Sequence, residues 1–308
     1  MRMGKNIRRG KNTILRTIGL TMLVLCVFIL SVSCTTPKGS SIVRNYHQGM
    51  LSPDIVNPLP QDKVYEGRPF YIPFQLVNNA AYPLENVVVT YEQVDSTYLD
   101  LYTPGYPLSG KIDGVGPFNP EAVPHDVAFD GAAKYLKAGT SYQDTIYWVK
   151  TKFNSKFSFA PTVCVGSSSF DIDSGSGCKV GEGPTTFSGQ GAPVGVTKME
   201  QIAYGQFGPQ IEFRMTISNR GPGDLLKMKM GTAMVGSETI RCTFPESTDP
   251  EGTTVELKQG QKETAVLCIY NVAGSASYKT PLSIDFDYTY EFSKKYNLRI
   301  MKAGRVAQ

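Results

Sequence analysis

The sequence predicts an all-β protein, because alternating apolar and polar residues recur along the chain and turn-forming residues are frequent. From 282 to 291 the alternation is unbroken, and residues 211–218 repeat it. A period of two is typical of a strand with one face on a core and the other in water. The 30 glycines, 20 prolines and 17 tyrosines also favour strands and turns over helices. Two packed sheets, a sandwich, are the commonest arrangement for this pattern at this length.

Further strands are predicted wherever the same pattern returns. Residues 70–76 alternate, but Pro73 lacks an N–H and therefore favours a sheet edge or a bulge. The remaining candidates are residues 86–91, 145–150, 163–165 and 265–270. Trp148, the single tryptophan of the chain, lies in one of these strands and is expected to be a core residue.

The two halves of the chain resemble each other, which predicts two sandwiches in tandem after an N-terminal hydrophobic helix. Residues 74–89 have the order strand, Asn-containing turn, strand, and residues 213–228 repeat this order. Residues 181–195 between them are rich in Gly and Pro, as in a linker or long loop. The predicted division is a signal peptide or membrane anchor at 1–33, a tether at 34–60, a first sandwich at 61–190 and a second at 191–303.

The N-terminal segment predicts membrane attachment and export of the remaining chain. Six bases lie within the first 16 residues, and residues 17–33 carry no charge. Signal peptides and N-terminal anchors share this order, with the basic end held in the cytoplasm. Residues 30–34 resemble a lipoprotein lipobox ending in Cys34, although Ser31 and Val32 depart from its preferred residues. We therefore expect cleavage before Cys34, a lipid on this cysteine and a mature chain outside the membrane.

Two alternatives for this segment remain open. Its 17 uncharged residues are at the short limit for a membrane-spanning helix, which would leave Cys34 an ordinary thiol. Cleavage after Gly10 would instead resemble the processing of type IV pilins and make the chain a pilin-like filament subunit. Lys11, Arg16 and the lack of a nearby glutamate depart from the pilin pattern.

The charge distribution argues against a nucleic-acid partner. Eight of the 31 bases precede Asp54, the first acidic residue. Residues 54–308 then hold 23 bases against 27 acids, so this part of the chain is slightly acidic. Nucleic-acid-binding domains carry a basic patch on the folded surface, which this sequence does not suggest.

Four cysteines beyond the N-terminal segment predict two disulfides. They fall as one pair in each half, Cys164 with Cys178 and Cys242 with Cys268. Exported cysteine pairs can oxidise, and closing loops of this size contributes about 3 kcal/mol in the chain-entropy model. Zinc sites usually contain closely spaced Cys-x2–4-Cys pairs, a spacing that this sequence lacks.

A short motif occurs twice in the chain. The first copy is Gly67-Arg-Pro-Phe followed by Pro-Phe-Gln-Leu-Val-Asn-Asn and Asn-Val-Val-Val, and residues 211–228 look like a second copy. This motif resembles the opening of the immunoglobulin-like adhesion modules of bacterial and archaeal surface proteins, the CARDB-like and related groups. The two-module layout also resembles uncharacterised secreted archaeal proteins. This resemblance implies immunoglobulin-like sandwiches and a place at the cell surface, and it supplies no catalytic residues.

A candidate metal site lies in the loop that Cys164 and Cys178 would close. Asp171 and Asp173, followed by glycines, have the spacing with which calcium loops direct oxygen atoms around a turn. A full site needs further oxygen ligands that the sequence does not identify. We therefore favour a polar hairpin tip, and calcium is the one cofactor considered.

Three tyrosines form a second candidate, a binding surface. Tyr98, Tyr102 and Tyr106 lie close together in the sequence, and exposed tyrosines are good contacts for a glycan or a protein partner. The favoured alternative is a loop folded back on the sandwich, because most aromatic rings in such domains are at least half-buried.

The sequence does not predict an enzyme. His125 and Asp126 would supply half of a hydrolase dyad, but no nucleophile elbow, P-loop, dinucleotide fingerprint or zinc-protease motif accompanies them. We expect a non-catalytic, membrane-anchored binding or scaffold protein on the outer face of the cell membrane, for instance in adhesion, with an envelope protein or glycan as partner. The enzymatic alternative is an accessory carbohydrate-active or hydrolytic protein that uses His125 or the Asp171 and Asp173 loop.

Overall fold

The computed structural model describes residues 47–58, 62–166, 178–181, 183–204, 210–273 and 277–304. Cys34 and the expected N-terminal helix lie outside these residues, and so do Asp171 and Asp173. Asn45–Gln308 form one compact unit. Its elements are β-strands, with no helix among the described residues, which confirms the all-β prediction.

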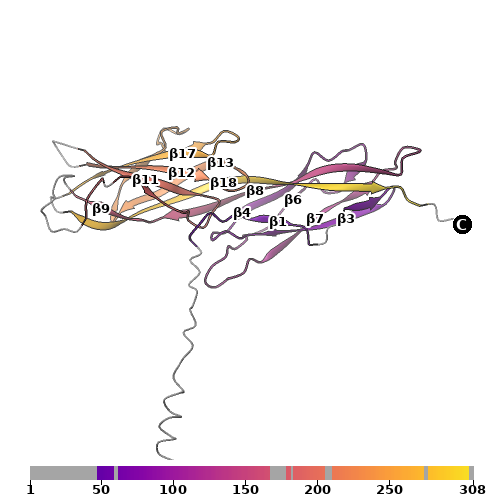
Figure 1. Cartoon of the computed structure of the whole chain (residues 1–308), viewed down its shortest axis with the longest axis horizontal. Helices are drawn as coiled ribbons and strands as arrows, with labels where there is room; N and C mark the ends of the chain where they lie inside the picture. The colour runs from indigo at the N-terminus through magenta and orange to yellow at the C-terminus, as the bar shows by residue number, and fades with distance from the viewer. Residues whose placement is uncertain are drawn as a thin grey trace, which may run out of the picture. The chain divides into compact units, whose positions relative to one another are not determined.

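Two long strands form the centre of the largest sheet. β18 (Tyr278–Met301) and β8 (Tyr142–Phe159) run side by side and antiparallel (Figure 1), in an unbroken register from Ile284 opposite Phe159 to Met301 opposite Tyr142. The sheet has nine strands, with the order β14-β13-β18-β8-β4-β6 along its main path. The other strands on this path are β13 (Asp224–Val235), β14 (Glu238–Thr239), β4 (Glu85–Glu92) and β6 (Gly105–Pro107).

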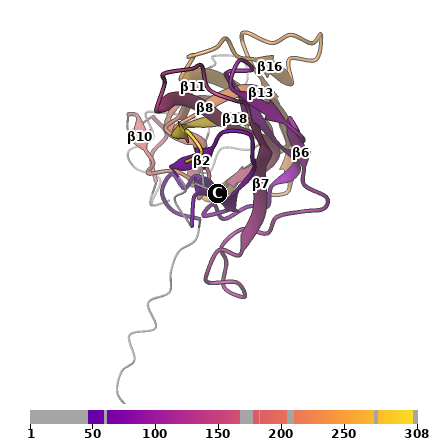
Figure 2. The same cartoon turned by 90° about the vertical axis from the view of Figure 1, so that its right-hand side faces the viewer.

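Three short strands complete this sheet away from its main path. β16 (Thr254–Glu256) pairs with β13, and β9 (Thr162–Val165) pairs with the first residues of β18. β2 (Lys63–Tyr65) lies parallel to the last residues of β18, near the C-terminal end of the chain (Figure 2).

A four-stranded antiparallel sheet packs on one part of the large sheet. Its order is β1 (Asp54–Val56), β3 (Pro69–Val77), β7 (Pro124–Ala133) and β5 (Leu99–Leu101). Phe129 of β7 stacks on Tyr147 of β8 with ring centroids 4.3 Å apart, and Phe74 of β3 contacts Tyr296 of β18 edge-on at 4.8 Å. Pro73 is opposite Ala128 of β7 and lies outside the residues of β3 that pair with β1. Its missing N–H therefore removes no hydrogen bond between β3 and β1.

A five-stranded antiparallel sheet packs on another part of the large sheet. Its order is β10 (Thr185–Thr186), β11 (Val194–Tyr204), β12 (Gln210–Asn219), β17 (Glu263–Asn271) and β15 (Arg241–Thr243). Phe187, next to β10, contacts Phe159 of β8 edge-on at 4.8 Å. Phe244, next to β15, lies 6.5 Å from Phe286 of β18.

Both small sheets cover the same face of the large sheet. The even-numbered residues of β18 from 280 to 292 are buried, as are Leu298 and Ile300, whereas none of the odd-numbered residues from 283 to 301 is buried. Since side chains alternate between the two faces of a strand, one face of β18 and β8 lies on the core. The opposite face, here called the open face, is exposed to solvent along both strands.

The predicted strands all coincide with strands of the structure. Residues 282–291 lie in β18, 211–218 in β12 and 70–76 in β3; the shorter candidates lie in β4, β8, β9 and β17. Strand β8, from the first predicted module, pairs with β18, from the second. The division into two immunoglobulin-like modules with a junction near residue 190 stays a prediction.

Candidate interaction surface

The open face carries a mixture of aromatic, aliphatic and charged side chains along β8. Tyr147 and Val149 are buried, so their neighbours on β8 point away from the core. These outward residues are Tyr142, Asp144, Ile146, Trp148 and Lys150. Trp148 is half-buried and belongs to this face, so the expectation that it is a core residue is wrong.

A cavity of about 690 Å³ lies at one end of this row. Its lining includes Asp144, Ile146 and Gln93, together with Asn297 and Arg299 of β18. Arg299 donates from Nε to Asp144 Oδ1 at 2.6 Å and from Nη2 to Oδ2 at 2.9 Å. These hydrogen bonds lower the pKa of Asp144 and raise that of Arg299. The guanidinium carbon also lies 4.5 Å from the centre of the Tyr142 ring, within cation–π range.

A second cavity, of about 250 Å³, surrounds Trp148 and Lys150. Lys150 Nζ lies 2.8 Å from Glu92 Oε1 and 3.1 Å from Glu291 Oε1, and these contacts raise the pKa of the lysine. Lys150 therefore bridges three neighbouring strands, β4, β8 and β18. Trp148 Nε1 is buried and has no hydrogen-bond partner among the described residues.

Gln93 lines both cavities, which are together called the Trp148 groove here. Its φ of 54° lies in the left-handed region, which non-glycine residues adopt at a cost. Such strained residues tend to occur at functional sites. The main chain after β4 is therefore held in an unfavourable conformation at a residue that borders both cavities.

A third cavity of about 300 Å³ lies between the same strands, in another part of their length. Three lysines line it, Lys156 of β8 with Lys227 and Lys229 of β13, together with Glu85 and Asp287. Its lysine lining contrasts with the carboxylate-rich lining of the Trp148 groove.

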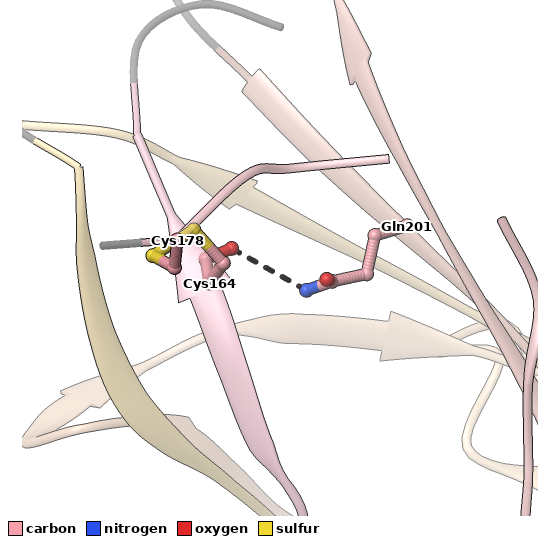
Figure 3. The surroundings of a disulfide bond; sticks show 3 residues. All are labelled: Cys164, Cys178 and Gln201. Carbon is pink, nitrogen blue, oxygen red and sulfur yellow. Dashed lines mark hydrogen bonds between the residues drawn. A yellow bond between two sulfur atoms is a disulfide. The ribbon is translucent and has the colours of Figure 1, made fainter. Parts of the chain in front are cut away.

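Both predicted disulfides are present. Cys164 of β9 is bonded to Cys178, and Figure 3 shows Gln201 of β11 beside this bond, with Nε2 donating to Cys164 O at 3.4 Å. Cys242 of β15 and Cys268 of β17 are bonded at directly opposed positions, and both are buried. Two disulfides suggest an oxidising, extracytoplasmic environment.

The three predicted tyrosines are divided between two sheets. Tyr98 is half-buried and packs against the core beside β5. Tyr102 is 62% exposed, and its N–H donates to Asp130 O of β7, whereas Tyr106 is 42% exposed and lies in β6 of the large sheet. Only Tyr98 agrees with the expectation that these rings fold onto the core.

His125 and Asp126 lie in β7, opposite Leu76 and Gln75 of β3. Asp126 Oδ1 accepts a hydrogen bond from Gln75 Nε2 at 3.2 Å. Within the described residues, no group of three or more His, Cys, Asp or Glu is placed to hold a metal ion.

No protein-family model and no curated protein matches this chain. The resemblance to CARDB-like modules therefore stays a prediction. Across the part of the chain that the structure describes, no helix is long and apolar enough to cross a membrane.

The sequence interpretation missed the Trp148 groove, although a signal for it was present. Within residues 145–150, Tyr147 and Val149 share the parity of one face, whereas Ile146 and Trp148 share the other. Apolar residues at both odd and even positions of a strand indicate that both of its faces carry apolar surface. The choice between a core and a binding surface required the positions of the covering sheets.

Proposed function

We propose that the protein is a non-catalytic binding or scaffold protein, held at the outer face of the cell membrane by its N-terminal segment. In this proposal the two halves are immunoglobulin-like modules, and the protein takes part in adhesion or supports an envelope complex. The finer fold assignment draws on the sequence motifs that resemble CARDB-like modules.

The observation that carries this proposal is the open face of the long sheet. Two small sheets cover one face of β18 and β8, while the other keeps Trp148, Ile146 and several charged groups accessible or half-buried. A rigid sheet is a precise platform for binding groups. The disulfides and the basic, then apolar N-terminal sequence support a location outside the cytoplasm.

Protease treatment of intact cells tests this proposal. A protein on the outer face is degraded when protease is added outside, after removal of any outer permeability barrier, whereas a cytoplasmic marker survives. Its cysteines other than those of the N-terminal segment should resist alkylation until a reductant is added. A protected chain with freely alkylated cysteines would contradict the proposal.

A further inference from the structure

We infer that the outer face of the four-stranded sheet, the side that points away from the large sheet, binds a basic side chain of a partner protein. The lysine or arginine would lie between Tyr71 and Tyr102 and pair with Asp130. The inference rests on the proposed function, since it names the chemistry of a partner for a binding protein. Its site is separate from the Trp148 groove and includes Tyr102, one of the three tyrosines that the sequence suggested as binding residues.

The strand register places an acidic side chain between two tyrosines. Tyr71 of β3 is directly opposite Asp130 of β7 (Figure 1). Tyr102 continues the pairing of β5 with β7, because its N–H donates to Asp130 O at 3.2 Å. The neighbours of Tyr71 and of Asp130 on their own strands are buried, and opposed residues point to the same face. With neighbouring strands about 5 Å apart, the Cα atoms of the two tyrosines are about 10 Å apart.

Both tyrosine rings of this row are open to solvent. Tyr71 is 59% exposed and Tyr102 is 62% exposed. The adjoining outward positions of β3 and β7 are proline or alanine: Pro69, Pro73, Ala128 and Ala132. Tyrosine is enriched among the residues that dominate protein–protein interfaces. A flat sheet face with exposed aromatic and apolar groups therefore suits a protein surface.

Asp130 carries a negative charge that this chain leaves unpaired. Among the described residues Asp130 has no ion pair, and its Oδ1 is buried without a hydrogen-bond partner. Lys134, four residues further along the chain, is held instead by Asp100 at 2.8 Å and by Ser96 O at 2.9 Å. A partly desolvated carboxylate without a countercharge is unfavourable, and a partner's basic side chain would supply one. The side chain as a whole is only half-buried, so the partner meets it between the two rings rather than at Oδ1.

The charge of this face favours a cation over an anion or a neutral ligand. The outward positions of β3 and β7 hold two acids, Asp126 and Asp130, and no base. Arg68 and Lys134 lie beyond these positions, directly before β3 and directly after β7. The face of a tyrosine ring attracts a cation. An anion would be repelled by Asp130, and a neutral ligand would leave its charge unpaired.

A tyrosine from the large sheet supports the row from beneath. The Tyr91 hydroxyl donates to Ala128 O of β7, two residues from Asp130. Burial raises the pKa of Tyr91, and Asp130, Tyr106 and Tyr71 raise it further, so these groups lie near its hydroxyl. Binding groups that the scaffold already holds in place lose little freedom when a partner binds.

A basic peptide tests the inference. Full-length protein in nanodiscs of zwitterionic lipid is titrated into a fluorescently labelled decapeptide of alternating Ala and Arg, and anisotropy measures binding. Matched decapeptides carry Gln or Glu in place of Arg. We expect saturable binding of the Arg peptide alone. No binding of the Arg peptide, or equal binding of the Gln peptide, would overturn the inference.

Variants show whether the peptide binds at this row. Asp130→Asn should weaken binding about tenfold, since a hydrogen bond to a charged group is lost. Tyr102→Ala should weaken it about fivefold, whereas Tyr71→Phe keeps an aromatic ring and should stay within about twofold. Asp287→Asn, the same charge change at an exposed residue of the open face, is the matched control and should bind normally. Undiminished binding by Asp130→Asn, with a fold confirmed by circular dichroism, would overturn the inference.

Two further measurements exclude other sites and occupants. The chain contains a single tryptophan, so a change in Trp148 emission reports binding at the Trp148 groove. We expect the Arg peptide to leave this emission unchanged, and a saturable change that Asp130→Asn does not alter would overturn the inference. Sedimentation tests a second copy as the occupant: dimerisation that Asp130→Asn abolishes would assign the face to self-association and also overturn it.

The failure of this inference can be told apart from the failure of the proposed function. A chain that external protease degrades on cells, but that binds no basic peptide, keeps the proposed location and loses the basic partner. A chain protected inside the cytoplasm loses the proposed location, whatever it binds in a titration.

Discussion

Arg299 and Asp144 form a two-pronged ion pair that joins the last strand of the chain to β8. The two hydrogen bonds are 2.6 and 2.9 Å long, and the two residues are directly opposed in the strand register. The pair is accessible to water, so its effect on stability is small and sensitive to salt. The pair fixes the orientation of the Arg299 guanidinium and the Asp144 carboxylate in the larger of the two cavities of the Trp148 groove.

The first prediction concerns the titration of Asp144. Its hydrogen bonds to Arg299 lower the pKa below the ordinary value of 3.8. Stability from this group is therefore present above that value and is lost as the pH falls through the lower folded-state pKa. Carboxyl-carbon NMR should show Asp144 titrating below 3.8, and Arg299→Ala should return the pKa towards it. An unchanged Asp144 pKa in the variant would show that the pair does not form in solution.

The second prediction concerns the aromatic contact that holds the four-stranded sheet on β8. Phe129 and Tyr147 are both buried and stacked. Phe129→Ala removes a large buried ring and should lower the free energy of unfolding by about 3–5 kcal/mol, measured by urea denaturation. Phe118→Ala is the matched control, because Phe118 is fully exposed and should change stability by no more than about 0.5 kcal/mol. Equal effects of the two substitutions would contradict this packing.

The third prediction concerns the buried disulfide between β15 and β17. Cys242 and Cys268 are 26 residues apart, so in the chain-entropy model their bond contributes about 3.5 kcal/mol. The double variant Cys242→Ala with Cys268→Ala should lose at least that much, because both side chains are buried. Guanidinium denaturation measures the loss. A double variant as stable as the parent would show that this bond does not constrain the unfolded chain.

The fourth prediction concerns Tyr290 at alkaline pH. Its hydroxyl accepts a hydrogen bond from Gly223 N–H at 2.8 Å and donates to Asn219 Oδ1 at 3.2 Å. Burial raises its pKa to about 12. Between its ordinary value of 10 and about 12 the unfolded chain loses this proton while the folded chain keeps it, so stability falls as the pH rises.

Urea denaturation at several alkaline pH values checks this slope against the variant Tyr290→Phe. The variant should be less stable near neutral pH by about 1–3 kcal/mol, because the buried Gly223 N–H loses its partner. It should also show a shallower decline with pH, since one titrating group is removed. Parallel pH profiles for the two proteins would contradict the assignment.

The sequence predicted the strands well, because alternation is a local property. Residues 211–218 and 282–291 carry complete alternation, and both lie within strands of the structure. Alternation states which side of a strand is buried, but it does not name the neighbouring strand. The pairing of β8 with β18 was therefore not foreseen, although it spans 18 residue pairs.

The end of β18 was harder to predict than its middle. Residues 293–295 are all exposed: Ser293 and Lys295 lie on the open face, and Lys294 lies between the regions covered by the two small sheets. Lys294 there reaches Asp54 Oδ1 at 3.0 Å and Ile55 O at 2.8 Å, which ties β1 to β18. These three exposed residues interrupt the alternation of buried and exposed positions. The sequence pattern therefore does not indicate that the strand continues, or on which face of the sheet Arg299 lies.

The central claim, attachment to the outer face of the membrane through the N-terminus, is tested most directly by mass spectrometry of the N-terminal peptide from membrane-extracted protein. The account predicts a mature chain that starts at a diacylglycerol-modified Cys34. A start at or near Met1 would replace the lipid with the uncharged run at 17–33 as the anchor. A start at Lys11 would contradict the account and identify a pilin-like filament subunit.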